Sequence, residues 1–92
     1  MKTYTATESQ EFLKIINLWH FADNAIERHF SFKNFSESLA FIIQVGLLAE
    51  KQDHHPEICN VYNKVTLKLS THDFNGVTSK DFDLATQINK IS

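Results

Sequence analysis

Apolar and polar side chains alternate along a long stretch of this chain, residues 59–72. The apolar parity is broken only at Asn63 and contains Val61, Val65, Leu67 and Leu69. The other parity contains Tyr62, Lys64, Thr66, Lys68, Ser70 and His72. Such alternation is typical of strands with one buried face and one face in solvent. We expect a bend at Asn63-Lys64 to divide the stretch into two strands, which commits the chain to a sheet with one covered face.

The sequence before this stretch predicts a helix and a second pair of strands. Phe12, Ile15 and Ile16 repeat at helical spacing, so we expect a first helix over residues 9–18. Residues 19–22 and 25–33 are predicted to be strands, the second because its apolar residues share one parity. Asp23-Asn24 between them is a turn signal, so the two strands are expected to form a hairpin.

A long helix is predicted to begin after Asn34, whose side chain can cap free backbone amides, with Glu37 completing a capping-box-like pair. Pro56 disfavours helical geometry in the residue before it, so the helix should end near residues 51–53. Its apolar side chains form two stripes. The first contains Phe35, Leu39, Ile42, Gly46 and Ala49, and the second contains Phe41, Val45 and Leu48. We expect the second stripe to be covered by another subunit.

A final helix is expected to begin at Thr78, with Asp81 at its third position. The element order is then α-β-β-α-β-β-α, within a single domain of residues 1–92. Antiparallel strand pairs separated by helices predict an α+β fold of two layers. One layer is a four-stranded antiparallel sheet, and the other consists of helices packed on one face of it.

Composition argues against several function classes. The net charge is −2 and the nine basic residues do not cluster, which disfavours binding of nucleic acid or of an acidic membrane surface. The longest apolar run is too short to span a bilayer, and the N-terminus lacks the apolar core of a signal peptide. Cys59 is the one cysteine, so no intrachain disulfide can form. We expect a cytoplasmic protein in which this thiol is a small buried hydrophobe.

Residues suited to acid–base chemistry gather between positions 50 and 81. Three of the five histidines lie there: His54 and His55 directly before Pro56, and His72 at the end of a predicted strand. Histidine exchanges protons near neutral pH, and strand ends and loops are where sites usually form. Glu50, near the end of the long helix, opposes the helix dipole and therefore needs another contact.

The same residues also have structural interpretations. His54 can complement the helix dipole, His55 can be a turn residue, and His72 alone fits a surface position. A metal site is the weaker alternative, because adjacent side chains diverge in extended backbone and no second short ligand spacing follows. His20 and His29 lie in the first strand pair, and we assign them no role.

At these residues the chain resembles the pterin-4a-carbinolamine dehydratase family, over residues 19–91. The matching residues are Phe30-Ser31-Phe32, Phe35, Ala40-Phe41, Ala49-Glu50, His54-His55-Pro56-Glu57, Asn60-Val61-Tyr62-Asn63-Lys64-Val65, Leu69, Ser70-Thr71-His72, Gly76, Thr78, Asp81 and Leu84-Ala85. The resemblance implies a four-stranded antiparallel sheet, assembly as homodimers or homotetramers, and no metal or other cofactor. It implies removal of water from 4a-hydroxytetrahydrobiopterin to give quinonoid dihydrobiopterin, which recycles the cofactor of aromatic amino-acid hydroxylases.

The resemblance also implies a role for each site residue. His54 and His72 would be the acid–base pair, and His55 would hold the pterin and assist. Glu50 would orient a histidine, and Asp81 would support His72. The pterin ring would be flanked by Asp53, Ser70, Thr71 and Asp73. Two other functions stay open: a catalytically idle module of this fold that docks to another protein, and an enzyme that acts on a different pterin.

Overall fold

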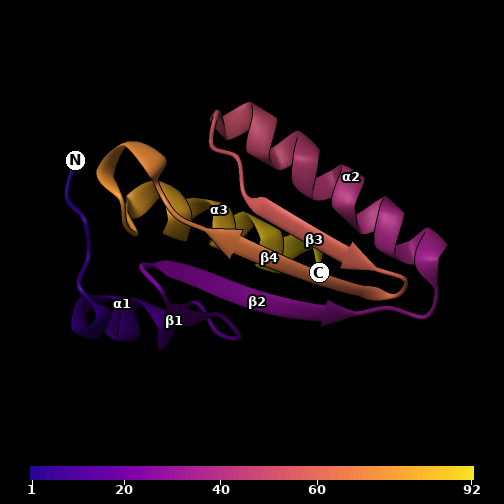
Figure 1. Cartoon of the computed structure of the whole chain (residues 1–92), viewed down its shortest axis with the longest axis horizontal. Coiled ribbons are helices and arrows are strands. Elements are labelled where there is room, and N and C mark those ends of the chain that lie inside the picture. Colours follow the sequence, from indigo (N-terminus) through magenta and orange to yellow (C-terminus); the bar gives the residue numbers. More distant parts are fainter.

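The computed structural model describes residues 1–92 and has the predicted order of elements, with one short 3-10 helix added. The elements are α1 (Ala6–Leu13), β1 (His20–Ala22), β2 (Ala25–Ser31), α2 (Phe35–Gln52), β3 (Glu57–Val61), β4 (Lys64–Leu69), the 3-10 helix η1 (His72–Phe74) and α3 (Ser79–Ile91). Figure 1 shows one open sheet with α2 and α3 running along it. The predicted α+β class with four antiparallel strands is confirmed.

The core lies between this sheet and the two longer helices. The strand order is β1-β2-β4-β3, which places β2 and β4 at the centre, paired from Ile26↔Leu69 to Ser31↔Lys64. Their buried face carries Ile26, Phe30, Val65, Leu67 and Leu69. The helices contribute Phe41, Val45 and Ala49 from α2, and Phe82, Leu84, Ala85 and Ile88 from α3. Each large apolar side chain buried in this way contributes about 1.5–3 kcal/mol.

The opposite face of the sheet, which we call the open face, carries the alternate and largely polar residues. Glu27 and His29 lie on it from β2, and Thr66 and Lys68 lie beside them on β4. None of these four side chains is fully buried. The period-two pattern of β4 thus divides core from solvent as the sequence predicted.

The turn between β3 and β4 corrects three predictions: the position of the bend, which was expected at Asn63-Lys64, and the burial of Val61 and of Cys59. Tyr62 and Asn63 form a two-residue turn, so Val61 pairs directly with Lys64, and Cys59 pairs with Thr66. Directly opposed residues share a face, which places Val61 and Cys59 on the open face. Val61 is 70% exposed and Cys59 is also exposed, so neither joins the core as predicted. The predicted alternation did not continue in phase across the turn.

Several element boundaries also differ from the predictions. The first helix begins at Ala6 rather than residue 9, because Thr5 caps it in a capping box with Glu8, and it ends at Leu13 rather than residue 18. The first strand pair is shorter than predicted, with β1 starting at His20 and β2 ending at Ser31. β3 begins at Glu57, two residues before the predicted alternation.

The predicted start and end of α2 are confirmed. Asn34 Oδ1 accepts a hydrogen bond from the Glu37 amide at 2.9 Å. Glu37 Oε1 accepts from the Lys33 amide rather than from the Asn34 amide, so the capping box is displaced by one residue. The helix ends at Gln52, and Asp53 caps it in the left-handed conformation. Neither this 18-residue helix nor any other is long and apolar enough to cross a membrane.

The assignment of the two apolar stripes of α2 was wrong. Phe41 and Val45, predicted to meet another subunit, are buried in the core, and Leu48 packs against that core. The exposed apolar side chains follow each other at intervals of four residues: Phe35, Leu39, Ile43 and Leu47, each between 42% and 68% exposed. We call this set the outer ridge of α2. Both sides of the helix are apolar, so composition could not decide which side meets the sheet.

Candidate active site

Two chain segments that are far apart in the sequence meet at one end of the sheet. His54 and His55 lie between α2 and β3, and Ser70 to Asp73 follow β4. β3 and β4 are antiparallel, with Glu57 opposite Lys68, so the segment before one strand adjoins the segment after the other. The left-handed turn at Asp53 and a hydrogen bond of 3.0 Å from the His54 amide to the Ala49 carbonyl set the direction of the first segment.

The two segments and the start of α3 line a polar hollow of about 310 Å³. Its lining residues are Asp53, His54, His55, Ser70, Thr71, His72, Asp73 and Lys80. A second hollow, of about 410 Å³, shares His55, Ser70 and His72 with the first. No hydrophobic residue lines either hollow. Volumes of this size suit a small molecule, and the lining suits one rich in hydrogen-bonding groups.

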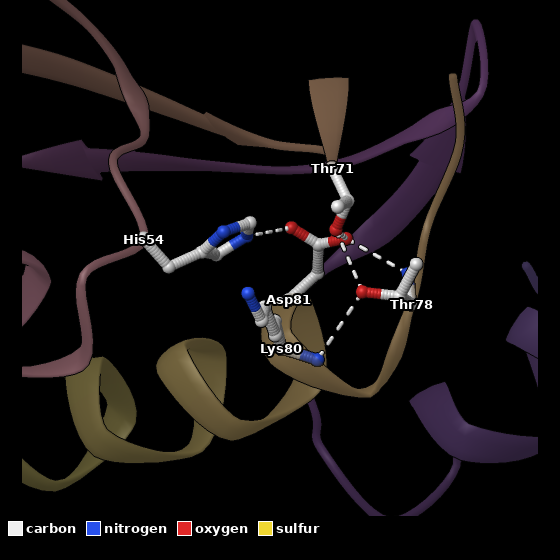
Figure 2. A network of polar contacts seen from close by, with 5 residues as sticks. All are labelled: His54, Thr71, Thr78, Lys80 and Asp81. Carbon is white, nitrogen blue, oxygen red and sulfur yellow. Dashed lines mark hydrogen bonds and ion pairs between the residues drawn. The ribbon is translucent and has the colours of Figure 1, made fainter. Parts of the chain in front are cut away.

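The buried carboxylate of Asp81 contacts two residues that line the hollow, His54 and Thr71 (Figure 2). Asp81 is completely buried, and its Oδ1 lies 2.5 Å from His54 Nε2. Its Oδ2 accepts from the Thr71 hydroxyl at 2.9 Å and from the Thr78 amide at 2.8 Å. The Thr78 contact belongs to the capping box that starts α3, as predicted for Thr78 and Asp81. The same side chain therefore caps a helix and holds a histidine.

The proton positions in this network follow from its chemistry. An ionised carboxylate only accepts hydrogen bonds, and a hydroxyl has one proton to donate. Thr71 donates its proton to Asp81, so the Thr78 hydroxyl must donate to Thr71 across their 2.6 Å contact. The His54 Nε2 must likewise carry the proton shared with Asp81. In a neutral His54 ring, Nδ1 is then the nitrogen with a free lone pair.

The surroundings of Asp81 compensate for the burial of its charge. An ionised carboxylate without partners would be strongly destabilised away from water. Here two N–H groups and one hydroxyl donate to it. It also lies in the first turn of α3, where the helix dipole favours negative charge. Bonds of this kind to charged groups contribute about 1.5–3 kcal/mol each, so the network stabilises the fold.

The structure changes how the predicted residues are paired. Asp81 contacts His54 and not His72, which corrects the predicted support of His72 by Asp81. Glu50, which was expected to orient one of the histidines, contacts His55: its Oε1 lies 2.7 Å from His55 Nε2, and both side chains are largely exposed. Thr71 is buried, and its hydroxyl contacts Asp81 and Thr78.

His72 and Lys80 also line the hollow. His72 lies exposed in η1, and its ring makes no hydrogen bond within the protein, so it is available to a bound molecule. Lys80 was not predicted, although it lines the hollow; it directly precedes Asp81 in the first turn of α3. A signal for it exists in the sequence, since a lysine in the first turn of a helix opposes the dipole. Its positive charge favours a ligand with carbonyl or anionic oxygen.

The fold and the hollow define a small α+β protein with a polar binding site and side chains suited to acid–base chemistry. The family model described as pterin 4 alpha carbinolamine dehydratase matches residues 2–91. The chain therefore belongs to this family, as its resemblance indicated.

Individual relatives agree with the family assignment. A protein of Sulfolobus acidocaldarius, named provisionally as a pterin-4-alpha-carbinolamine dehydratase, is 49% identical over 73 residues, which cover 79% of this chain and 80% of the relative. A Picosynechococcus protein with the same provisional name is 51% identical over 81 residues, 88% of each chain. The crystal structure of a transcriptional coactivator/pterin dehydratase from Brucella melitensis superposes with a TM-score of 0.92 at 43% identity, covering 98% of both chains.

A more distant structure shares only the fold. It is described as a pterin dehydratase-like protein that is a RuBisCO assembly factor in the alpha-carboxysome. Its TM-score is 0.64 at 16% identity, covering 78% of this chain and 83% of that one.

Proposed function

We propose that this protein removes water from 4a-hydroxytetrahydrobiopterin and gives quinonoid dihydrobiopterin, in the recycling of tetrahydrobiopterin. Family membership supports a pterin dehydratase. The observation that carries the proposal for this chain is the polar hollow with His54, His55 and His72 around it, one of them held by a buried aspartate. We place the reaction in the cytoplasm.

The reaction needs one proton acceptor and one proton donor. The substrate carries a hydroxyl on carbon 4a and a proton on the adjacent nitrogen 5. A base removes the nitrogen proton, and the electrons of that bond form the new carbon–nitrogen double bond. The carbon–oxygen bond breaks at the same time, and an acid protonates the departing hydroxide to give water. Positioned histidines can perform both transfers without a metal or cofactor.

The network around Asp81 favours His54 as the base. Its Nδ1 has the free lone pair when the ring is neutral, while Nε2–H is held by the carboxylate. When Nδ1 accepts the substrate proton, Asp81 stabilises the imidazolium that forms, as the aspartate of a catalytic triad does. His72, which has no partner in the protein, is then the acid.

The remaining side chains are assigned to substrate binding. His55, oriented by Glu50, contacts the pterin and assists. Asp53, Ser70 and Asp73 line the hollow and offer acceptors and donors to the edge of the ring. Thr71 acts through Asp81, because its hydroxyl is buried in that network.

A stopped-flow dehydratase assay on synthetic 4a-hydroxy pterins with different side chains tests this proposal directly. We expect rapid dehydration that depends on the pterin ring and is much weaker in His72→Ala. Full activity on a pterin with another side chain and none on the biopterin form would point to a different pterin substrate. No acceleration with any of these compounds would overturn the proposal.

The outer ridge of α2 supports a second proposal, which concerns the association of this chain with copies of itself. We propose that it is covered by further copies of this chain in a homodimer or homotetramer. Contiguous apolar patches of this kind are rare on monomers, and the ridge covers nearly the whole length of the helix. If the protein bound a partner protein through this ridge and had no dehydratase activity, the non-catalytic docking function would replace the first proposal.

A further inference from the structure

A second group of ionisable side chains lies on the open face of the sheet, outside the polar hollow. It consists of His20 on β1 and Glu27 and His29 on β2, and we call it the sheet-face cluster. His20 is the direct cross-strand partner of Glu27, and His29 follows Glu27 by two residues on the same face. The dehydration mechanism uses none of these three side chains.

The donor atoms of the sheet-face cluster converge on one point. Glu27 Oε2 lies 2.9 Å from His29 Nε2 and 3.5 Å from His20 Nε2. All three atoms lie within 4.8 Å of one another. Ligand bonds of zinc are about 2.0–2.2 Å long, so two ligands of a tetrahedral ion are about 3.4 Å apart. The two distances from Glu27 bracket this value. The two imidazole rings are stacked with their centroids 5.8 Å apart, so both exposed rings must turn for their Nε2 atoms to share one ion.

A neighbouring residue supports one of these ligands from behind. The Thr66 hydroxyl on β4 lies 3.0 Å from His29 Nδ1, the nitrogen that faces away from Glu27. Histidines that bind metals almost always donate their other N–H to an oxygen, which fixes the tautomer and the ring orientation. A hydroxyl can donate to Nδ1 in the free protein and accept from Nδ1–H when Nε2 binds an ion. Thr66 therefore fits both states.

We propose that the sheet-face cluster binds a divalent transition-metal ion of the zinc type, with the remaining coordination positions filled by water. Two imidazoles and one carboxylate are a ligand set that zinc uses in proteins. All three residues are accessible, with side chains 55%, 25% and 61% exposed for His20, Glu27 and His29. Lys68, opposite Glu27 on β4, is the one cation paired with the cluster across the sheet, and it weakens the attraction.

A bound ion is expected to link β1, the shortest strand, to β2 through side chains. β1 has three residues and is joined to β2 by a tight turn in which Asp23 and Asn24 both adopt left-handed conformations. An ion that joins His20 to Glu27 and His29 connects β1 to β2 through side chains as well as backbone. Binding to the folded state alone stabilises it by mass action. The melting temperature should therefore rise with zinc concentration.

Isothermal titration calorimetry with Zn²⁺ tests the proposal in the variant His55→Ala/His72→Ala, which lacks the exposed histidines of the hollow. We expect this variant to bind one Zn²⁺ ion per chain. His20→Ala or His29→Ala should weaken binding by at least about tenfold, because even loss of a supporting hydrogen bond costs 10–100-fold. Thr66→Val should weaken it by about tenfold and Thr66→Ser should restore it. Cys59→Ser, on the same face, should have no effect.

Two kinds of result would contradict the proposal. Zinc binding that is lost in the His55→Ala/His72→Ala variant, or that persists in His20→Ala and His29→Ala, would place the ion elsewhere and overturn the proposal. No binding at micromolar zinc would show that the cluster is only a hydrogen-bonded group. Melting curves with and without zinc on the same variants provide a second measurement, and circular dichroism confirms that each variant is folded.

Discussion

Replacing Asp81 with asparagine should separate its role in catalysis from its role in the fold. In Asp81→Asn the amide oxygen must take the position of Oδ2, because both the Thr71 hydroxyl and the Thr78 amide donate there. The amide NH₂ then faces His54 Nε2, which is also an N–H in the native protein. Two donors cannot bond, so His54 must move its proton to Nδ1. The lone pair that we propose accepts the substrate proton is thereby lost.

The size of both effects can be estimated. Three hydrogen bonds end on Asp81, and each changes from a bond to a charged group to a neutral one, a loss of about 1 kcal/mol. The upper limit of destabilisation is therefore about 3 kcal/mol, since a neutral amide is also easier to bury. A domain with about 5–15 kcal/mol of stability should still fold. Turnover should fall by about 10²–10⁴-fold, the usual effect of losing a positioned base.

Three measurements decide the outcome. Stopped-flow kinetics gives turnover, urea unfolding gives stability, and the nitrogen-15 shifts of the His54 ring report which nitrogen is protonated. Thr71→Val is the matched control, because it removes one donor to Asp81 but leaves the contact between Asp81 and His54. Thr71→Val should be less stable by about 1–3 kcal/mol, but its turnover should fall much less than that of Asp81→Asn. A folded Asp81→Asn protein with a moved proton and nearly native turnover would refute the assignment of His54 as base.

Three further predictions concern the site and the assembly. His54→Ala and His72→Ala should each lower turnover by about 10²–10⁴-fold, whereas alanine at either histidine of the sheet-face cluster should change it little; equal losses at all four would indicate general destabilisation. Exhaustive chelation should leave dehydratase activity intact, and restoration of a lost activity by zinc would contradict the acid–base mechanism. Leu47→Glu on the outer ridge should dissociate a folded oligomer, whereas Val45→Glu, placed in the core, should unfold the protein. Sedimentation equilibrium measures this, and a native mass near 10.6 kDa at micromolar concentration would defeat the prediction of an oligomer.

Much of the fold could be predicted because its signals are local. The alternation in β4, the asparagine cap of α2 and the capping box of α3 each depend on residues within a few positions of one another. The phase of β3 could not be predicted in the same way. Its register depends on which two residues form the turn, and a displacement of one residue moves every side chain to the other face.

The side of α2 that faces the sheet could not be predicted from local signals. Its two apolar stripes are similar in composition, and both satisfy helical periodicity. The stripe with Phe41 and Val45 packs on the sheet. Phe41 contacts the ring of Phe30, and both stripe residues belong to the same buried cluster as Phe30. Only the shape of the complete core determines that choice. The outer ridge remains on the surface, where the proposed contact with further copies of this chain would form.

Most residues that line the polar hollow could be predicted from the sequence, whereas Lys80 and the contacts among these residues could not. Antiparallel pairing of β3 with β4 brings the His-His-Pro segment to the Ser-Thr-His segment, whatever the side chains do afterwards. Which histidine Asp81 contacts depends on how the first turn of α3 lies against the end of α2. The capping box predicts the hydrogen bond that Asp81 Oδ2 accepts from the Thr78 amide, but it predicts no partner for Oδ1. No spacing in the sequence indicates that this partner is His54.

This double use of Asp81 links the stability of the fold to the chemistry of the site. The proton positions in the network follow from the helix cap, through Thr78 and Thr71, to the carboxylate and then to His54. Any change that loosens the start of α3 should therefore also disturb the contact with Asp81 that keeps the His54 proton on Nε2. A helix cap is normally worth about 1 kcal/mol of stability. Here, if His54 is the base, the same cap is also a condition for proton transfer.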